Sequence, residues 1–240
     1  MPKEETIFHH FQGYDIPIKV YKEFRNGSRY AFTSKQIIFR IPKTLLKSSE
    51  KAYIEKGLKW VEKTLRTKPG LLDKVVPKSY PNNFIIRSMD QDFRVVIIPS
   101  TNENSSFKKV DDTINIKISQ NHVDKTQVLL SKVFRKIHKA AFEREVHEIN
   151  SQLFKKEVNT IRLKYNKTNW GSCSTKKNLN FSTRCLLLPK WLRSYIIVHE
   201  LSHLLEMNHS HRFWKEVEKR YPEYKKAEKF LTEKGHQFDF

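Results

Sequence analysis

The chain of 240 residues has few cysteines, few glycines and no long apolar run, and each shortage excludes a class of protein. Its two cysteines, Cys173 and Cys185, form no C-x-x-C metal motif, so we expect reduced thiols packed as small apolar side chains. No apolar stretch approaches the roughly 18 residues that span a bilayer, and the start lacks the pattern of a signal peptide. The six glycines form no phosphate-binding loop. These shortages predict a cytoplasmic protein without membrane contact.

Acidic residues are also in deficit, with 26 aspartates and glutamates against 46 lysines and arginines, a formal net charge of +20. This excess favours polyanionic partners such as nucleic acid or nucleotide phosphates, bound without sequence preference. Lysines on solvated faces would give the same composition, so both interpretations stay open. The hydrophobic content of 38%, with 16 Phe, 9 Tyr and 4 Trp, is enough for a packed core.

Periodicity and turn residues predict a β-rich first half with one helix. Two extended runs, 7–24 and 29–41, flank Asn26-Gly27, a dipeptide typical of a two-residue hairpin. The later elements expected in this half are a helix and three short strands, at 44–66, 83–87, 93–98 and 113–118. The second half alternates helices and strands, expected at 125–156, 161–165, 178–187, 191–207, 213–220 and 224–233. We therefore expect an α+β fold, with a β-rich region at 1–120 and a second domain at 121–240.

The strongest motif is His-Glu-x-x-His at 199–203, inside an apolar run that indicates a buried helix. Residues four apart lie on one helix face, so His199 and His203 can direct ring nitrogens at one ion. Glu200 lies one step round and can reach a water on that ion. This is the pattern of a catalytic zinc site with its general base.

A catalytic zinc usually has three protein ligands. His209 is the leading candidate for the third, because Asn208 can end the helix and turn the chain back toward the metal. The spacing of the three histidines is that of the metzincins, but Glu206 replaces their turn glycine and no Met-turn follows. The residues alone leave four competitors open as the third ligand: His211, Glu216, Glu218 and Glu223.

Several motifs together resemble the YgjP-like metallopeptidase family, whose members resemble the SprT and WLM zinc proteases. The residues that carry the resemblance are Thr168 to Ser174, Arg184, Pro189, the His199 to His203 motif, Asn208-His209-Ser210 and Phe213-Trp214. It covers about residues 125–231 closely and 28–66 more weakly. The resemblance implies a zincin-like domain at 121–240, with His199, His203 and His209 as Zn²⁺ ligands and Glu200 as general base.

We therefore expect a zinc-dependent hydrolase acting on a peptide or protein substrate. Gly171 would let an extended substrate approach the strand above the metal helix, or Trp170 to Ser172 would form a structural turn. Arg184 would neutralise a charge near the site or form a structural ion pair. Two other functions stay open: a UTP-type nucleoside-triphosphate pyrophosphatase, and a non-catalytic nucleic-acid-binding protein with a structural zinc.

Overall fold

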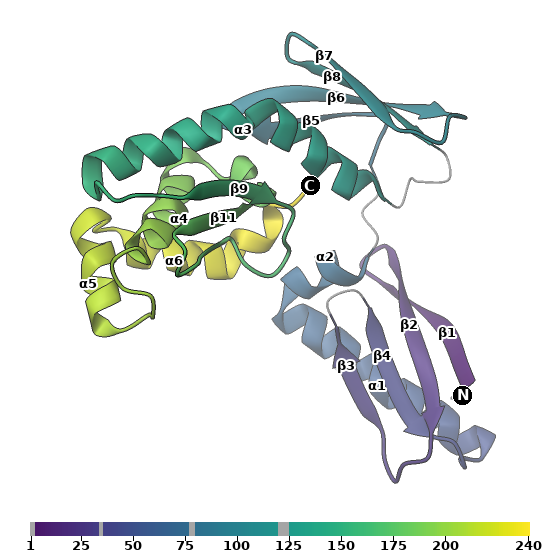
Figure 1. The fold of residues 1–240 in the computed structure, drawn as a ribbon. Helices are drawn as coiled ribbons and strands as arrows, with labels where there is room; N and C mark the ends of the chain where they lie inside the picture. The colour runs from purple at the N-terminus through teal and green to yellow at the C-terminus, as the bar shows by residue number, and fades with distance from the viewer. Residues whose placement is uncertain (1–2, 34–35, 77–79, 120–124) are drawn as a thin grey trace. The chain divides into compact units, whose positions relative to one another are not determined.

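The computed structural model describes residues 3–33, 36–76, 80–119 and 125–240 (Figure 1). The chain divides into two compact units, Met1–Ser79 and Tyr80–Phe240, and each combines helices with mixed sheets. The predicted α+β class is therefore confirmed. In the described part of the chain, no helix has both the length and the apolar character needed to cross a bilayer.

The N-terminal unit is a four-stranded sheet with helices on it. The strands β1 (Lys3–Phe11), β2 (Tyr14–Glu23), β3 (Arg29–Phe32) and β4 (Ile37–Pro42) lie in the order β1-β2-β4-β3. Alternate residues of β2 and β4 are buried, as expected for a sheet with one covered face. Helix α1 (Lys47–Thr67) buries Val61 and Leu65 in the same apolar cluster, and η1 (Pro69–Leu71) and α2 (Leu72–Val75) follow it.

The hairpin expected at Asn26-Gly27 is wrong, because the strands on either side of it are not paired. Strand β2 pairs in parallel with β4, and β3 pairs antiparallel with β4. A tight turn of this sheet lies between β1 and β2, where Gln12 and Gly13 both take positive φ angles. Gln12 is not a residue type typical of positive φ angles, so the sequence did not predict a turn here.

The C-terminal unit contains two sheets. One has the order β5-β6-β8-β7, from β5 (Asn83–Ser88), β6 (Gln91–Ser100), β7 (Ser106–Val110) and β8 (Thr113–Ser119). The other has the order β10-β11-β9, from β9 (Thr160–Lys164), β10 (Gly171–Cys173) and β11 (Asn178–Ser182). Strand β7 was not predicted, because this mostly exposed edge strand shows no regular alternation of apolar side chains. The strand expected at 178–187 ends at Ser182, whose side chain caps the 3-10 helix η3 (Thr183–Leu187).

Helix α3 (Thr126–Leu153) joins these two sheets into one core (Figure 1). Phe134 packs edge-on against Phe93 of the first sheet, with ring centroids 5.6 Å apart. Eight residues later on the helix, Phe142 packs against Phe181 of the second sheet at 5.1 Å. The domain boundary expected near residue 120 falls on residues 120–124, outside the described residues. The chain divides into its two compact units between Ser79 and Tyr80, and the β5–β8 sheet shares a core with α3.

Three further helices complete the C-terminal unit: α4 (Lys190–Ser202), α5 (His211–Arg220) and α6 (Tyr224–Lys234), followed by η4 (Gly235–Gln237). Helix α4 is buried around most of its circumference, as its apolar sequence predicted. It ends at Ser202, earlier than expected, so His203 occupies its C-cap.

Candidate metal centre

The start of α4 is fixed by the turn between β5 and β6. Asp90 takes a positive φ in this turn, and its carboxylate accepts a hydrogen bond from the backbone N–H of Lys190 at 3.2 Å. The same carboxylate pairs with buried Arg193 at 2.9 Å, and Glu145 of α3 pairs with Arg193 at 2.7 Å. A carboxylate near the N-terminus of a helix stabilises the helix. The two ion pairs of Arg193 also hold α4 to the β5–β6 turn and to helix α3. The last turn of α4 carries His199 and Glu200.

The structure brings His199, His203 and His209 together. Their ligand-type nitrogen atoms all lie within 4.8 Å of one another, and the Nε2 atoms of His199 and His209 are 3.0 Å apart. After α4 the chain turns through 203–209, and Ser210 then caps α5 by accepting from the backbone N–H of Phe213. The turn and the cap place His209 beside helix α4, next to His199.

Packing and hydrogen bonds orient the rings. The ring of Phe213 stacks on His203 with centroids 4.5 Å apart and meets His199 edge-on at 4.9 Å. The Nδ1 atom of His203 lies 3.2 Å from the carbonyl oxygen of Glu206. A hydrogen bond from Nδ1 to a carbonyl leaves Nε2 as the free ligand atom, a second contact typical of metal-binding histidines.

The three histidines fit a metal ion by their chemistry. Burial, and then the neighbouring His203 and His209, lower the pKa of His199 to about 3, so its ring is neutral at physiological pH. Burial likewise lowers the pKa of His203. A neutral imidazole has one ring nitrogen with a free lone pair. The Nε2 atoms of His199 and His209 face each other, so their lone pairs would repel unless a proton or a cation lies between them. Three imidazoles are a donor set that zinc accepts readily.

Glu200 is the buried carboxylate of the site, with 4% of its surface exposed. Its Oε2 atom is buried without a hydrogen-bond partner among the described residues. Burial raises the pKa of Glu200 to about 8, and a nearby cation would favour the ionised form. An unpartnered buried oxygen is costly, so its presence beside three histidines indicates a functional group.

Gly171 of strand β10 makes room for this carboxylate. A Cβ atom at Gly171 would lie 2.5 Å from Oε1 of Glu200 and 2.6 Å from its Cδ atom, closer than atoms can approach. The backbone of β10 therefore passes directly over the side chain of Glu200. β10 is also an edge strand, because the sheet order is β10-β11-β9.

An open cavity of about 440 Å³ adjoins Glu200, His199 and His209. Tyr195 and Glu228 also line this cavity, and neither was predicted from the sequence. The hydroxyl of Tyr195 lies 3.5 Å from Nδ1 of His199 and also hydrogen-bonds to Glu228 of α6. Tyr195 stands four residues before His199 on the same helix face, a spacing that could have found it. No local signal indicated Glu228.

The other candidate residues lie apart from this group. In the described ranges, His209 joins the two motif histidines, and no other histidine, cysteine or carboxylate belongs to this group. His211 is exposed at the start of α5, Glu216 pairs with Arg220, and Glu223 pairs with Lys226. Glu218 is an exposed residue of α5.

Arg184 and Trp170 form a structural pair beside the site. The guanidinium of Arg184 lies 4.1 Å from the centre of the Trp170 ring and donates to the carbonyls of Lys167, Gly235 and Phe238. Its donors are therefore used within the fold. Trp170 packs against the guanidinium of Arg184, which is a structural role, and the next residue begins strand β10. Cys173 and Cys185 are free cysteines, as expected.

Comparison with known proteins gives a family and similar solved structures, two of which are described here. A family model described as YgjP-like, metallopeptidase domain, matches residues 31–234. A metallopeptidase zymogen, abylysin of Pyrococcus abyssi, is 27% identical over 39% of this chain and 95% of its own, with a TM-score of 0.36. The metallopeptidase zymogen jannalysin of Methanocaldococcus jannaschii is 28% identical over the same shares, with a TM-score of 0.35. No curated protein matches the chain significantly.

Proposed function

The chain belongs to the YgjP-like metallopeptidase-domain family, and from this membership we propose that it is a zinc-dependent peptidase with a zincin-like C-terminal unit. His199, His203 and His209 would hold the zinc, and Glu200 would act as general base. The single observation that carries the proposal is the group of three histidine nitrogens within 4.8 Å of one another, beside a buried unpartnered carboxylate oxygen. The chemistry that zinc supplies when bound is Lewis acidity toward a carbonyl and toward water.

Glu200 performs the proton transfers in this mechanism. Its free Oε2 atom accepts a proton from the attacking water and then passes it to the leaving amine of the peptide. Gly171 keeps Glu200 in place, because the lack of a Cβ lets the backbone of β10 lie against the carboxylate. Tyr195, 3.5 Å from Nδ1 of His199, orients that ring.

An extended peptide is the substrate that best suits the shape of the site. Strand β10 presents a free edge directly above Glu200, where a peptide can add as a further strand through main-chain hydrogen bonds. Side-chain preferences would then come from the 440 Å³ cavity, whose apolar lining includes Trp170, Ile196 and Leu231.

The cavity argues against a nucleoside triphosphate as substrate. Among the described residues that line it are two carboxylates, Glu200 and Glu228, and neither lysine nor arginine. A triphosphate carries several negative charges and would need cations there. A structural zinc is equally disfavoured, because structural sites take four protein ligands and the described group supplies three.

Zinc content tests the ligands. We expect about one zinc per chain in the purified protein, lost in His199→Ala, His203→Ala and His209→Ala, because each removes one of only three ligands. His211→Ala is the matched control, since this exposed histidine lies outside the group. Elemental analysis measures the zinc content of the three variants and of the control. Full zinc retention by one of the three variants would remove that residue from the ligand set.

Turnover tests the base. Glu200→Gln should keep the zinc and the fold but lose at least ~100-fold in cleavage of unfolded casein, because an amide cannot accept the proton. Wild type and variant are assayed in parallel for pyrophosphate release from nucleoside triphosphates. Pyrophosphate release that depends on Glu200, without peptide cleavage, would replace the peptidase by the nucleotide hydrolase.

A further inference from the structure

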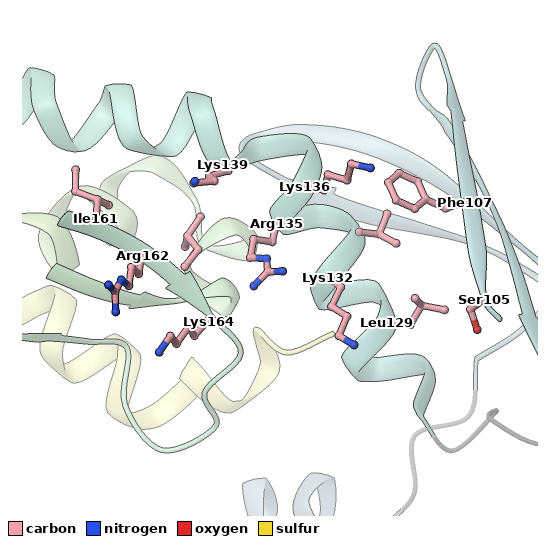
Figure 2. A pocket seen from close by; sticks show the side chains of 12 residues that line it. Ser105, Phe107, Leu129, Lys132, Arg135, Lys136, Lys139, Ile161, Arg162 and Lys164 are labelled. Carbon is pink, nitrogen blue, oxygen red and sulfur yellow. The ribbon is translucent and has the colours of Figure 1, made fainter. Parts of the chain in front are cut away.

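The largest cavity among those described lies away from the histidine group. It has a volume of about 650 Å³ and lies between helix α3, strand β9 and strand β7 (Figure 2). We call it the basic groove, because six of its twelve lining residues are cations: Lys132, Arg135, Lys136, Lys139, Arg162 and Lys164. No aspartate or glutamate is among these lining residues.

The charges of the basic groove are largely uncompensated. Across the described residues, the one ion pair made by these six cations joins Lys139 to Glu143 at 3.7 Å. Lys132 to Lys139 follow the spacing i, i+3, i+4, i+7 along α3, which places them on one helix face over about 10 Å. Arg162 and Lys164 are two apart on β9 and so project on one side of the strand. The lining of the groove therefore takes its positive charges from two elements, helix α3 and strand β9 (Figure 2).

The groove also has an apolar part. Phe107 of β7 is half-buried, and Lys136 lies 5.5 Å from the centre of its ring. Leu129 and Ile161 are further half-buried apolar residues of the lining. Cations that follow a backbone, together with an accessible aromatic ring, are the combination by which proteins bind single-stranded nucleic acid.

We propose that the basic groove binds single-stranded nucleic acid, with its cations on the phosphates and Phe107 against a base. A duplex keeps its bases stacked inside and would leave the apolar part of the groove unused. An acidic peptide offers carboxylates but no planar rings to stack on Phe107. The net charge of +20 predicted a polyanionic partner without a location, and the groove gives that partner a binding surface.

The groove and the histidine group lie at opposite edges of one sheet. The order β10-β11-β9 puts the groove at the β9 edge and Glu200 at the β10 edge, about 10 Å across three strands. The two cavities share no lining residue. A bound strand would therefore leave the β10 edge free, and a protein held on the same nucleic acid could reach the peptidase site.

The test is fluorescence anisotropy with labelled 20-nucleotide strands of oligo-dT and oligo-U, a 20-base-pair duplex, and unlabelled polyglutamate as competitor. The full-length groove variant carries Lys132→Gln, Arg135→Gln, Arg162→Gln and Lys164→Gln. The matched control removes the same four charges elsewhere on the C-terminal unit, through Arg144→Gln, Lys176→Gln, Lys219→Gln and Lys229→Gln, all at exposed positions. Zinc content and melting temperature verify that both variants fold.

We expect the groove variant to bind a single strand at least tenfold more weakly than wild type, and the control less than threefold. Loss of four phosphate contacts should also reduce the slope of log K against log salt by roughly 2.8. The DNA and RNA arms identify which strand is preferred, and Phe107→Leu should weaken both without changing the salt slope. Three results would each overturn the proposal. They are equal losses of affinity in the groove variant and the control, tighter binding of the duplex than of the single strand, and displacement of the labelled strand by polyglutamate as effective as that by the same strand unlabelled.

Discussion

The two units of the chain differ in what they bury. In the described part of the N-terminal unit, the buried side chains of the core are aliphatic or aromatic, such as Ile18, Phe39 and Val61. The buried polar and charged side chains found in the described residues all lie in the C-terminal unit, among them Arg193 and Glu200. Burying a charge costs free energy unless it is paired. That cost therefore falls on the unit that carries the candidate site.

Within the C-terminal unit, the buried charges fall into two kinds. Arg184 and Arg193 have partners for their donors, and these contacts fix the C-terminal segment and helix α4. Glu200 has an oxygen without one. Glu145 also has one unpartnered oxygen, but its other oxygen pairs with Arg193, whereas Glu200 makes no ion pair with any described residue, as expected of a functional group.

The largest effect should come from breaking the architectural pair. Arg193→Met should destabilise α4 by about 3–5 kcal/mol, because it leaves the half-buried carboxylate of Glu145 without its cation. Hydrogen exchange of the α4 amides reports this loss without contribution from the N-terminal unit.

The counterpart in the N-terminal unit is Arg40→Met. Arg40 pairs with Glu23 at 2.8 Å but is 46% exposed, so its removal should cost no more than about 1 kcal/mol. If the two substitutions cost the same, buried charge does not distinguish the units in stability.

A single added methyl group should separate the two units by function. Gly171→Ala places a Cβ 2.5 Å from the Glu200 carboxylate and must displace it. Because a misplacement of about 1 Å can cost about 100-fold, we expect a turnover loss of that order with zinc content unchanged. Casein cleavage and elemental analysis measure the two quantities.

Gly57→Ala makes the same change in the N-terminal unit, where the Cβ would lie 2.5 and 2.7 Å from atoms of the Phe39 ring. Overpacking of an apolar core should cost about 1–3 kcal/mol and leave turnover unchanged. Gly27→Ala is the neutral control, since no atom of the described residues lies within 4 Å of its Cβ position. Turnover loss in Gly57→Ala equal to that in Gly171→Ala would contradict the division of roles.

The smallest effect concerns His138 of α3, which is 5% exposed with its Nε2 unpartnered among the described residues. Burial, and then the positive charges of Arg193 and Lys109, lower its pKa from 6.5 to about 4. Below pH 6.5 the unfolded chain takes up a proton that the folded chain does not, so stability falls as pH drops toward 4.

His138→Phe should therefore reduce the difference in unfolding free energy between pH 7 and pH 5 by on the order of 1 kcal/mol. Urea titrations at the two pH values measure it. His138→Gln is the second variant, because it keeps a polar atom in the core but cannot titrate. If the pH dependence persists in both variants, His138 is not its source.

The sequence predicted best what depends on neighbours along the chain. His199 and His203 are four residues apart in the sequence, and His209 needs one turn to join them, so their spacing was enough to predict that the three side chains lie close together. The helices α1, α3, α5 and α6 followed from apolar periodicity in the same way.

Spacing and periodicity could not predict contacts between residues that are far apart in the sequence. The approach of Gly171 to Glu200 spans 29 residues, and its only sign in the sequence is a missing side chain. The pairing of β2 with β4 brings in a strand that does not follow β2 directly, whereas the Asn26-Gly27 signal refers only to consecutive strands. The basic groove likewise collects lysines and arginines from α3 and β9, which composition alone could not assign to one surface.

The turn that holds Asp90 against the start of α4 determines which pieces of this protein can be exchanged by recombination. A crossover near residue 120 would transfer the metal helix without Asp90, and so without the partner of Arg193 and the acceptor for the N–H of Lys190. A crossover between Ser79 and Tyr80 keeps this turn, the helix and the histidine group on one inherited segment. Chimeras of related chains joined at the second point should keep the contacts that hold the start of α4, and those joined at the first should lose them.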